Sequence, residues 1–131
     1  MSEAVKAQTE VAIQNLDLLV AASQTAGAKI EIFESSKTVD LKWGNRPVAV
    51  GKIEVVDGAQ RFDIAIVEKK GVKGTYELVY DHMFNIVPVK EIGVLYNMHL
   101  LAACAEAKSG YQTTKAFAKV NGQWVTEVER A

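Results

Sequence analysis

Residues 48–80 decide the fold and read VAVGKIEVVDGAQRFDIAIVEKKGVKGTYELVY. β-Branched and aromatic side chains recur through this stretch, as is typical of strands, and two turn signals interrupt it. The first signal is Asp57-Gly58, which predicts a tight hairpin, and the second is the longer segment Lys69–Gly74. Three strands are therefore predicted: Val48–Val56, Arg61–Glu68 and Thr75–Tyr80. Because short turns join them, they form an antiparallel meander.

The chain before the meander predicts a strand, a helix and two further strands. Residues 16–26 carry the helix signal, because Asn15 is a good N-cap and Gly27 suits the left-handed position that ends helices. Asp17 adds a negative charge where the helix dipole favours one. The strands expected here are Glu3–Gln14, Lys29–Glu34 and, after a loop at residues 35–37, Thr38–Trp43. For Glu3–Gln14 a frayed, alanine-bearing helix is the alternative.

After the meander the sequence predicts a second helix and a terminal hairpin. The helix begins between Val89 and Ile92 and stops at Gly110. Asn121-Gly122 joins the last two strands, Tyr111–Val120 and Gln123–Glu129. The order strand, helix, strands, helix, hairpin predicts one α+β domain over residues 1–131, with both helices on one face of an antiparallel sheet. The expected core is Leu16, Leu19, Val20, Ile30, Ile32, Ile64, Ile66, Leu78, Leu95, Met98 and Leu101.

Composition excludes several classes of protein. The 131 residues carry 15 Lys+Arg against 16 Asp+Glu, a net charge of -1, which argues against a binder of long nucleic acid. No apolar run approaches the length of a membrane span and no signal peptide is recognisable, so a cytoplasmic protein without a membrane partner is expected. Cys104 is the single cysteine, in keeping with a reducing compartment. It lies in an apolar helical stretch and is expected in the core, where it would not be catalytic.

Several segments together resemble one protein family. These are the run Asn15–Leu19 leading to Ala26-Gly27, the runs Arg61–Ile66 and Gly74–Asp81, and Tyr96–His99 through Ala107 to Gly110-Tyr111. In this order they are similar to the uncharacterised chloroplast and cyanobacterial reading frame thirty-five family, also catalogued as domain of unknown function twelve fifty-seven. The resemblance implies a small α+β protein of a kind also found in bacteriophages. Through the gene neighbourhoods of that family, it implies an AAA-type ATPase as partner.

The residues offer little catalytic chemistry. No serine stands in a nucleophile turn, and no glycine pattern matches a nucleotide-binding loop. The two histidines, His82 and His99, are not at a recognised metal spacing. Alternation places Arg61 and Asp63 on the solvated face of their strand, opposite Phe62. We therefore predict no catalytic residue, no metal site and no cofactor.

A ligand site can still be proposed from the aromatic and basic residues. Trp43 beside Arg46 could stack a planar ligand and hold its phosphate, although an edge-covering tryptophan and a solvated turn arginine are the simpler and favoured explanation. His99 has a plain alternative too, as a helix residue hydrogen-bonded to the sheet or at its edge. The candidate ligand-binding set is Trp43, Arg46, Asp81, His82, Tyr96 and His99.

Three functions are compatible with these observations. The first is a non-enzymatic binding or adaptor protein that acts through a protein partner, for which the family resemblance implies an AAA-type ATPase. The second is a sponge of the phage anti-defence kind, which sequesters an anionic, nucleotide-derived immune signal; the basic loop at residues 69–73 would assist it. The third, an enzyme acting on a nucleotide or phosphoester, ranks last because two isolated histidines do not make a mechanism. Oligomeric state, including homo-oligomerisation, is left open by the sequence.

Overall fold

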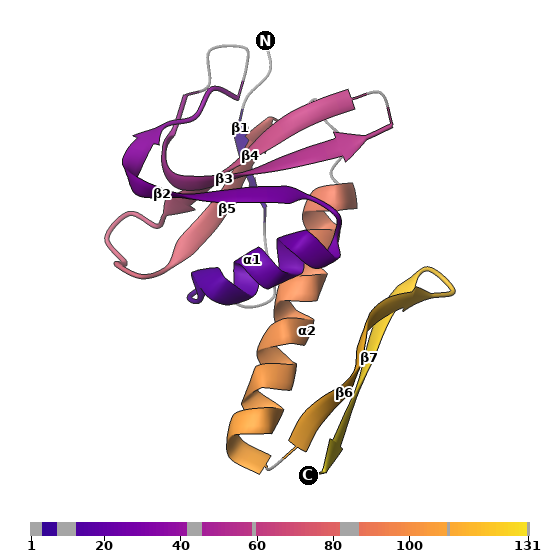
Figure 1. Ribbon diagram of the computed structural model, residues 1–131. Helices are drawn as coiled ribbons and strands as arrows, with labels where there is room; N and C mark the ends of the chain where they lie inside the picture. Colours follow the sequence, from indigo (N-terminus) through magenta and orange to yellow (C-terminus); the bar gives the residue numbers. More distant parts are fainter. Residues whose placement is uncertain are drawn as a thin grey trace.

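The computed structural model describes residues 4–7, 13–41, 46–58, 60–81, 87–109 and 111–130 of the chain (Figure 1). Its elements are β1 (Ala4–Ala7), α1 (Leu16–Thr25), β2 (Lys29–Thr38), β3 (Val48–Asp57), β4 (Gln60–Glu68), β5 (Tyr76–Asp81), α2 (Val87–Ser109), β6 (Tyr111–Val120) and β7 (Gln123–Arg130). Five strands form one antiparallel sheet in the order β1-β5-β4-β3-β2, and β6 pairs with β7 in a second sheet. The predicted α+β class is confirmed.

The central meander follows from its two turns. Asp57 pairs with Gln60 to close the first hairpin, and Gly58 adopts the positive φ of 62° that this tight turn requires. At the second turn the Lys69 N–H donates to the Thr75 carbonyl at 2.7 Å, which starts β5 beside β4. Both predicted turns and all three predicted meander strands are therefore present, within one or two residues of the expected bounds.

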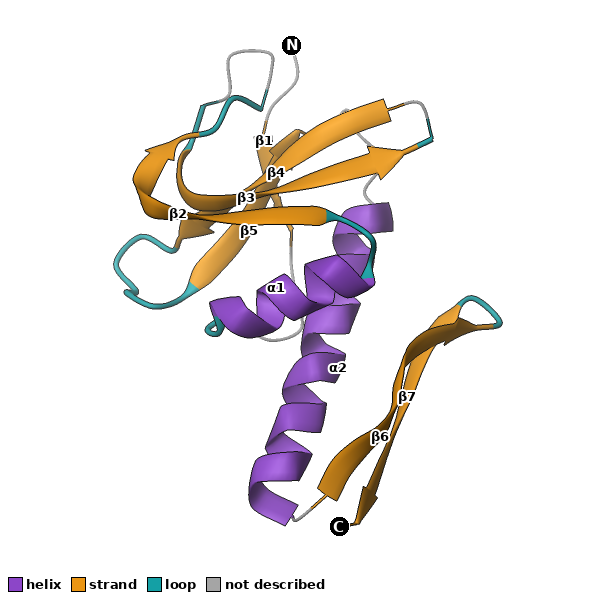
Figure 2. Cartoon of the chain, in the orientation of Figure 1, coloured by secondary structure: helices purple, strands orange, loops and turns teal. Residues whose placement is uncertain are grey.

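One face of the five-stranded sheet carries the main core. Along β4, Phe62, Ile64 and Ile66 are buried on this face, while Arg61 is exposed on the other, as the alternation predicts. Both helices lie against this same face (Figure 2). The buried cluster that joins the helices to the sheet comprises Ile13, Leu19, Ala22, Ile53, Val55, Phe62, Ile64, Ile66, Leu78, Tyr80, Val89, Ile92, Leu95 and Tyr96.

A smaller apolar cluster lies on the opposite face, and the prediction for residues 35–41 needs correction there. β2 continues through residues 35–37, where its register to β3 shifts between Ile32 and Lys37, so the expected loop is part of the strand. Residues 39–41 are irregular rather than the expected strand, and residues 42–43 of that prediction lie outside the described residues. Val39 and Leu41 fold over Ala65 and Val79 on this face, which explains their apolar alternation without a strand.

Helix α2 begins at Val87, two residues before the earliest expected start. Pro88 falls in its first turn, where proline is tolerated because the backbone N–H it lacks would have no partner within the helix. Two expected core residues of α2 are exposed: Leu101 is 69% exposed, and Cys104 is exposed as well. Leu101 follows the buried Leu95 by six residues, which places its side chain about 120° away around the helix axis. The two side chains therefore point to different sides of α2, which explains the error. On β2, Ile32 is also more open than expected, at 40% exposure.

The terminal hairpin β6–β7 lies along α2, away from the five-stranded sheet (Figure 1). Asn121 and Gly122 both have positive φ, 51° and 78°, as predicted for a two-residue turn of this type. Trp124 packs its half-buried ring against the main core. The side chain of Lys119, paired with Trp124 across the hairpin, reaches Glu91 on α2.

Candidate functional site

The candidate ligand-binding residues are placed in different parts of the fold. Trp43 and His82 lie outside the described residues. Arg46 is exposed just before β3, with its Nη2 4.0 Å from the Oδ2 of Asp40. Asp81 is buried, at 1% exposure, where β5 pairs with β1. Because β3 and β5 both run antiparallel to β4, the start of β3 and the end of β5 lie at opposite ends of the sheet. Arg46 and Asp81 therefore do not belong to one site.

Tyr96 connects α2 to the segment that precedes α1. Its ring is 1% exposed. Its hydroxyl oxygen accepts hydrogen bonds from the backbone N–H of Gln14 at 3.0 Å and of Asn15 at 3.2 Å. Asn15 is also the N-cap of α1, since its Oδ1 accepts from the Leu18 N–H at 3.2 Å. The Tyr96 hydroxyl thus fixes the start of α1.

His99 joins the two helices one turn further along α2. Its Nε2 lies 3.2 Å from the Thr25 hydroxyl of α1. The same hydroxyl lies 2.9 Å from the Ala21 carbonyl, to which it donates, and the His99 tautomer with its proton on Nε2 satisfies both contacts. Burial lowers the pKa of His99 from its ordinary value of 6.5.

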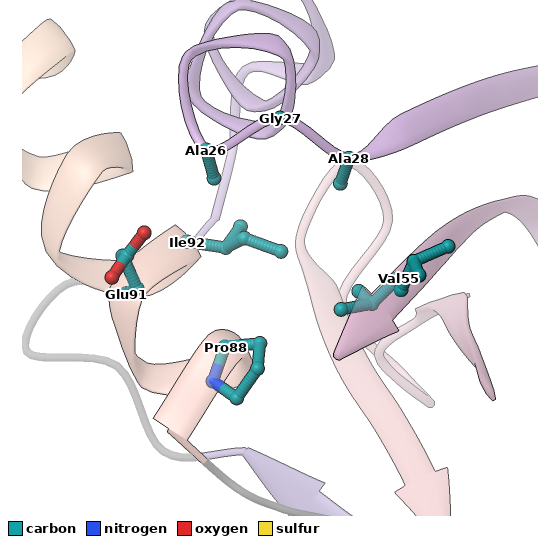
Figure 3. A pocket seen from close by; sticks show the side chains of 8 residues that line it. Ala26, Gly27, Ala28, Val55, Pro88, Glu91 and Ile92 are labelled. Carbon is teal, nitrogen blue, oxygen red and sulfur yellow. The ribbon is translucent and has the colours of Figure 1, made fainter. Parts of the chain in front are cut away.

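A small cleft lies between the end of α1, the end of β3 and the first turns of α2 (Figure 3). Figure 3 shows Pro88, Glu91 and Ile92 of α2 on one side and Ala28 and Val55 on the other. Ala26, Gly27 and Val56 complete its lining. Its volume is about 40 Å³, far below the roughly 300–1,000 Å³ typical of sites for drug-sized ligands.

An ion pair stands at the rim of this cleft. The Nζ of Lys119 lies 3.0 Å from the Oε2 of Glu91 and 5.8 Å from the centre of the Trp124 ring. The Glu91 side chain is 22% exposed and that of Lys119 is 48% exposed. Sequence reasoning missed this site, because its lining comes from three distant segments and contains mostly alanine, valine and proline.

A second feature is the solvent-facing side of α2. Val87, Val94 and Leu101 recur every seven residues and are 59%, 51% and 69% exposed. Seven residues make nearly two full turns, so the three side chains form one line along the helix. Lys90 and Cys104 are exposed on the same side. We call these five residues the α2 outer face. Its seven-residue repeat is visible in the sequence and could have been recognised there.

Comparison of the chain with protein-family models, curated proteins and solved structures finds no match. The arrangement of the residues themselves therefore carries the functional argument. In the described part of the chain, no three His, Cys, Asp or Glu side chains gather where they could hold a metal ion. No helix among the described residues has the length and apolar character needed to cross a membrane.

Proposed function

We propose that this chain is a non-enzymatic binding protein that acts through a protein partner, docked on the α2 outer face. The observation that carries the proposal is the line of exposed Val87, Val94 and Leu101. Isolated apolar residues on a surface need no explanation, but three of them aligned on one long helix form an apolar strip, which Lys90 interrupts. Such a strip resembles one row of the seam on which an amphipathic helix docks.

Charge indicates what kind of helix would fit. Lys90 lies beside the strip, between Val87 and Val94. A second copy of the chain docked in parallel would place Lys90 against its own counterpart, which is unfavourable. A partner helix with an acidic residue at that position would instead be attracted. The family resemblance implies an AAA-type ATPase, which we retain as the first partner class to test.

The strip cannot be the whole interface. Complete burial of a valine or leucine side chain contributes about 1.5–3 kcal/mol, so the exposed halves of three contribute roughly 2–4 kcal/mol. Association costs about 4–15 kcal/mol, so further contacts are needed. Val120 and Val125, which are 51% and 42% exposed on the hairpin, offer additional apolar surface. The cleft beside Glu91 is much smaller than a nucleotide, so it does not add support to the nucleotide-sponge alternative.

The test compares Val94→Asp/Leu101→Asp with Val72→Asp, a control at a valine that is 44% exposed in the turn between β4 and β5. All three positions are exposed, so both variants should fold like the wild type. Affinity is measured by calorimetry with a purified AAA-type ATPase. The double variant should bind at least about tenfold more weakly, since two charges would be buried against an apolar seam. Binding unchanged in the double variant, or lost equally in Val72→Asp, would contradict the proposal.

Cys104 offers an independent check on the same face. It is exposed one turn beyond Leu101. A bulky maleimide attached to Cys104 should block the partner, and bound partner should slow the labelling reaction. Labelling at an equal rate with and without partner would place the interface elsewhere.

A further inference from the structure

We propose that the cleft between α1 and α2 is a recognition site for a basic side chain, lysine or arginine, of a bound protein segment. The aliphatic stem would lie across the cleft and the cationic head would meet Glu91 at the rim. This site is distinct from the α2 outer face and does not depend on it.

The walls of the cleft suit an aliphatic stem. Ala26, Ala28, Val55 and Val56 line it from α1, the following turn and β3, and Pro88 and Ile92 line it from α2 (Figure 3). Val56 is 57% exposed, so the apolar surface continues beyond the cleft. The small volume of about 40 Å³ accepts part of one side chain rather than a whole ligand. Lysine and arginine commonly lay their methylene stems along such a surface and keep the charged head in water.

The Glu91 carboxylate is the group at the rim that would attract a cation. The end of α1 and the start of α2 both border the cleft, and their partial charges are opposite in sign. No basic residue lies in the last turn of α1 and no acidic residue lies in the first turn of α2. The carboxylate of Glu91, whose charge Lys119 partly offsets, therefore determines which head group is attracted.

The chain already shows that Glu91 binds a basic side chain. Lys119 reaches over from the hairpin and places its Nζ 3.0 Å from one carboxylate oxygen. The Lys119 side chain is 48% exposed, so this ion pair is weak and exchangeable. A carboxylate also has two oxygens and can accept bonds from a second cation. An incoming arginine could share Glu91 with Lys119 or displace it.

The experiment uses single-residue probes and amide NMR of the intact protein. N-acetyl-arginine N-methylamide and the lysine analogue, at about 10 mM, should shift the amides of Ala26, Ala28, Val56 and Ile92 in a saturable way, as millimolar binding predicts. The norleucine analogue has the stem without the charge, and the aspartate analogue has the opposite charge. Both should bind at least about tenfold more weakly than arginine, since charge-assisted bonds dominate the contact.

Two variants test whether the Glu91 carboxylate binds the cationic head group of the probe. Glu91→Gln should weaken arginine binding about tenfold, whereas Lys119→Gln should strengthen it severalfold by removing a competitor for the carboxylate. Leu101→Asp, on the α2 outer face, should change it by less than about twofold. Equal binding of norleucine and arginine, preferential binding of aspartate, unchanged binding in Glu91→Gln, or no shift with any probe would each overturn the proposal. None of these results bears on the α2 outer face, so the two proposals fail separately.

Discussion

Tyr96→Phe should destabilise the protein although the exchange removes only one oxygen atom. The ring is 1% exposed, so phenylalanine keeps the packing of the core. What disappears is the acceptor for the backbone N–H groups of Gln14 and Asn15. Both donors belong to the segment that leads into α1, and the hydroxyl holds them from a position 82 and 81 residues away in the chain.

The expected loss of stability depends on how deeply the two N–H donors are buried. Leaving a buried donor without a partner costs about 1–3 kcal/mol. The two N–H groups are only partly buried and their residues are exposed, so water replaces some of the lost bonding. We therefore expect a loss of about 1–2 kcal/mol in the free energy of unfolding, which lowers Tm by about 3–8 °C for a domain of this size.

Urea unfolding followed by circular dichroism would measure this loss, and hydrogen exchange would locate it. The amides of Gln14 and Asn15 should exchange faster in Tyr96→Phe, while those of β4 should follow the global stability. Tyr76→Phe is the matched control, because it removes a hydroxyl from a half-buried ring. A loss below about 0.5 kcal/mol together with unchanged exchange at Gln14 would refute the assigned role of the hydroxyl.

Two further changes test the packing of the sheet and of the helices. Gly51→Ala should cost about 1–3 kcal/mol, seen as a lower urea midpoint, because the new methyl would lie 2.6 Å from the Glu31 carbonyl of the neighbouring strand; an unchanged midpoint would mean that β2 and β3 separate freely. His99→Gln should reduce the loss of stability in acid. The folded-state pKa of His99 is lowered by burial, so the unfolded chain binds this proton more readily than the folded chain as pH falls through 6.5, and wild-type stability declines below that pH. Unfolding free energies at pH of about 7.5 and 5.5 should therefore fall more in wild type than in His99→Gln, and an equal fall would exclude His99 as the cause.

The parts of this fold that the sequence predicts correctly are those set by local chemistry. The Asn15 cap and the Asn121-Gly122 turn each depend on residues within a few positions, and both form as expected. The meander follows for the same reason, because each strand pairs with its neighbour in the chain.

Features that depend on distant residues could not be predicted in this way. Val39 and Leu41 look like a strand until Ala65 and Val79 are seen beneath them. Leu101 has the apolar side chain of a core residue, and it is exposed only because of where the sheet lies relative to α2. The contacts of the candidate site residues also depend on distant segments. Tyr96 and His99 were selected for their chemistry, but Tyr96 bonds to the backbone before α1 and His99 contacts Thr25 of that helix.

The place of β1 in the sheet has a consequence for synthesis on the ribosome. β1 pairs with β5, and Ala4 lies opposite Asp81, so the first strand needs a partner made 77 residues later. At a translation rate of about 5–20 residues per second, this partner appears roughly 4–15 s after β1. During that interval β3 and β4 can already pair, because their hairpin is local. β1 therefore closes one edge of the sheet as a late step, after the centre of the meander has formed.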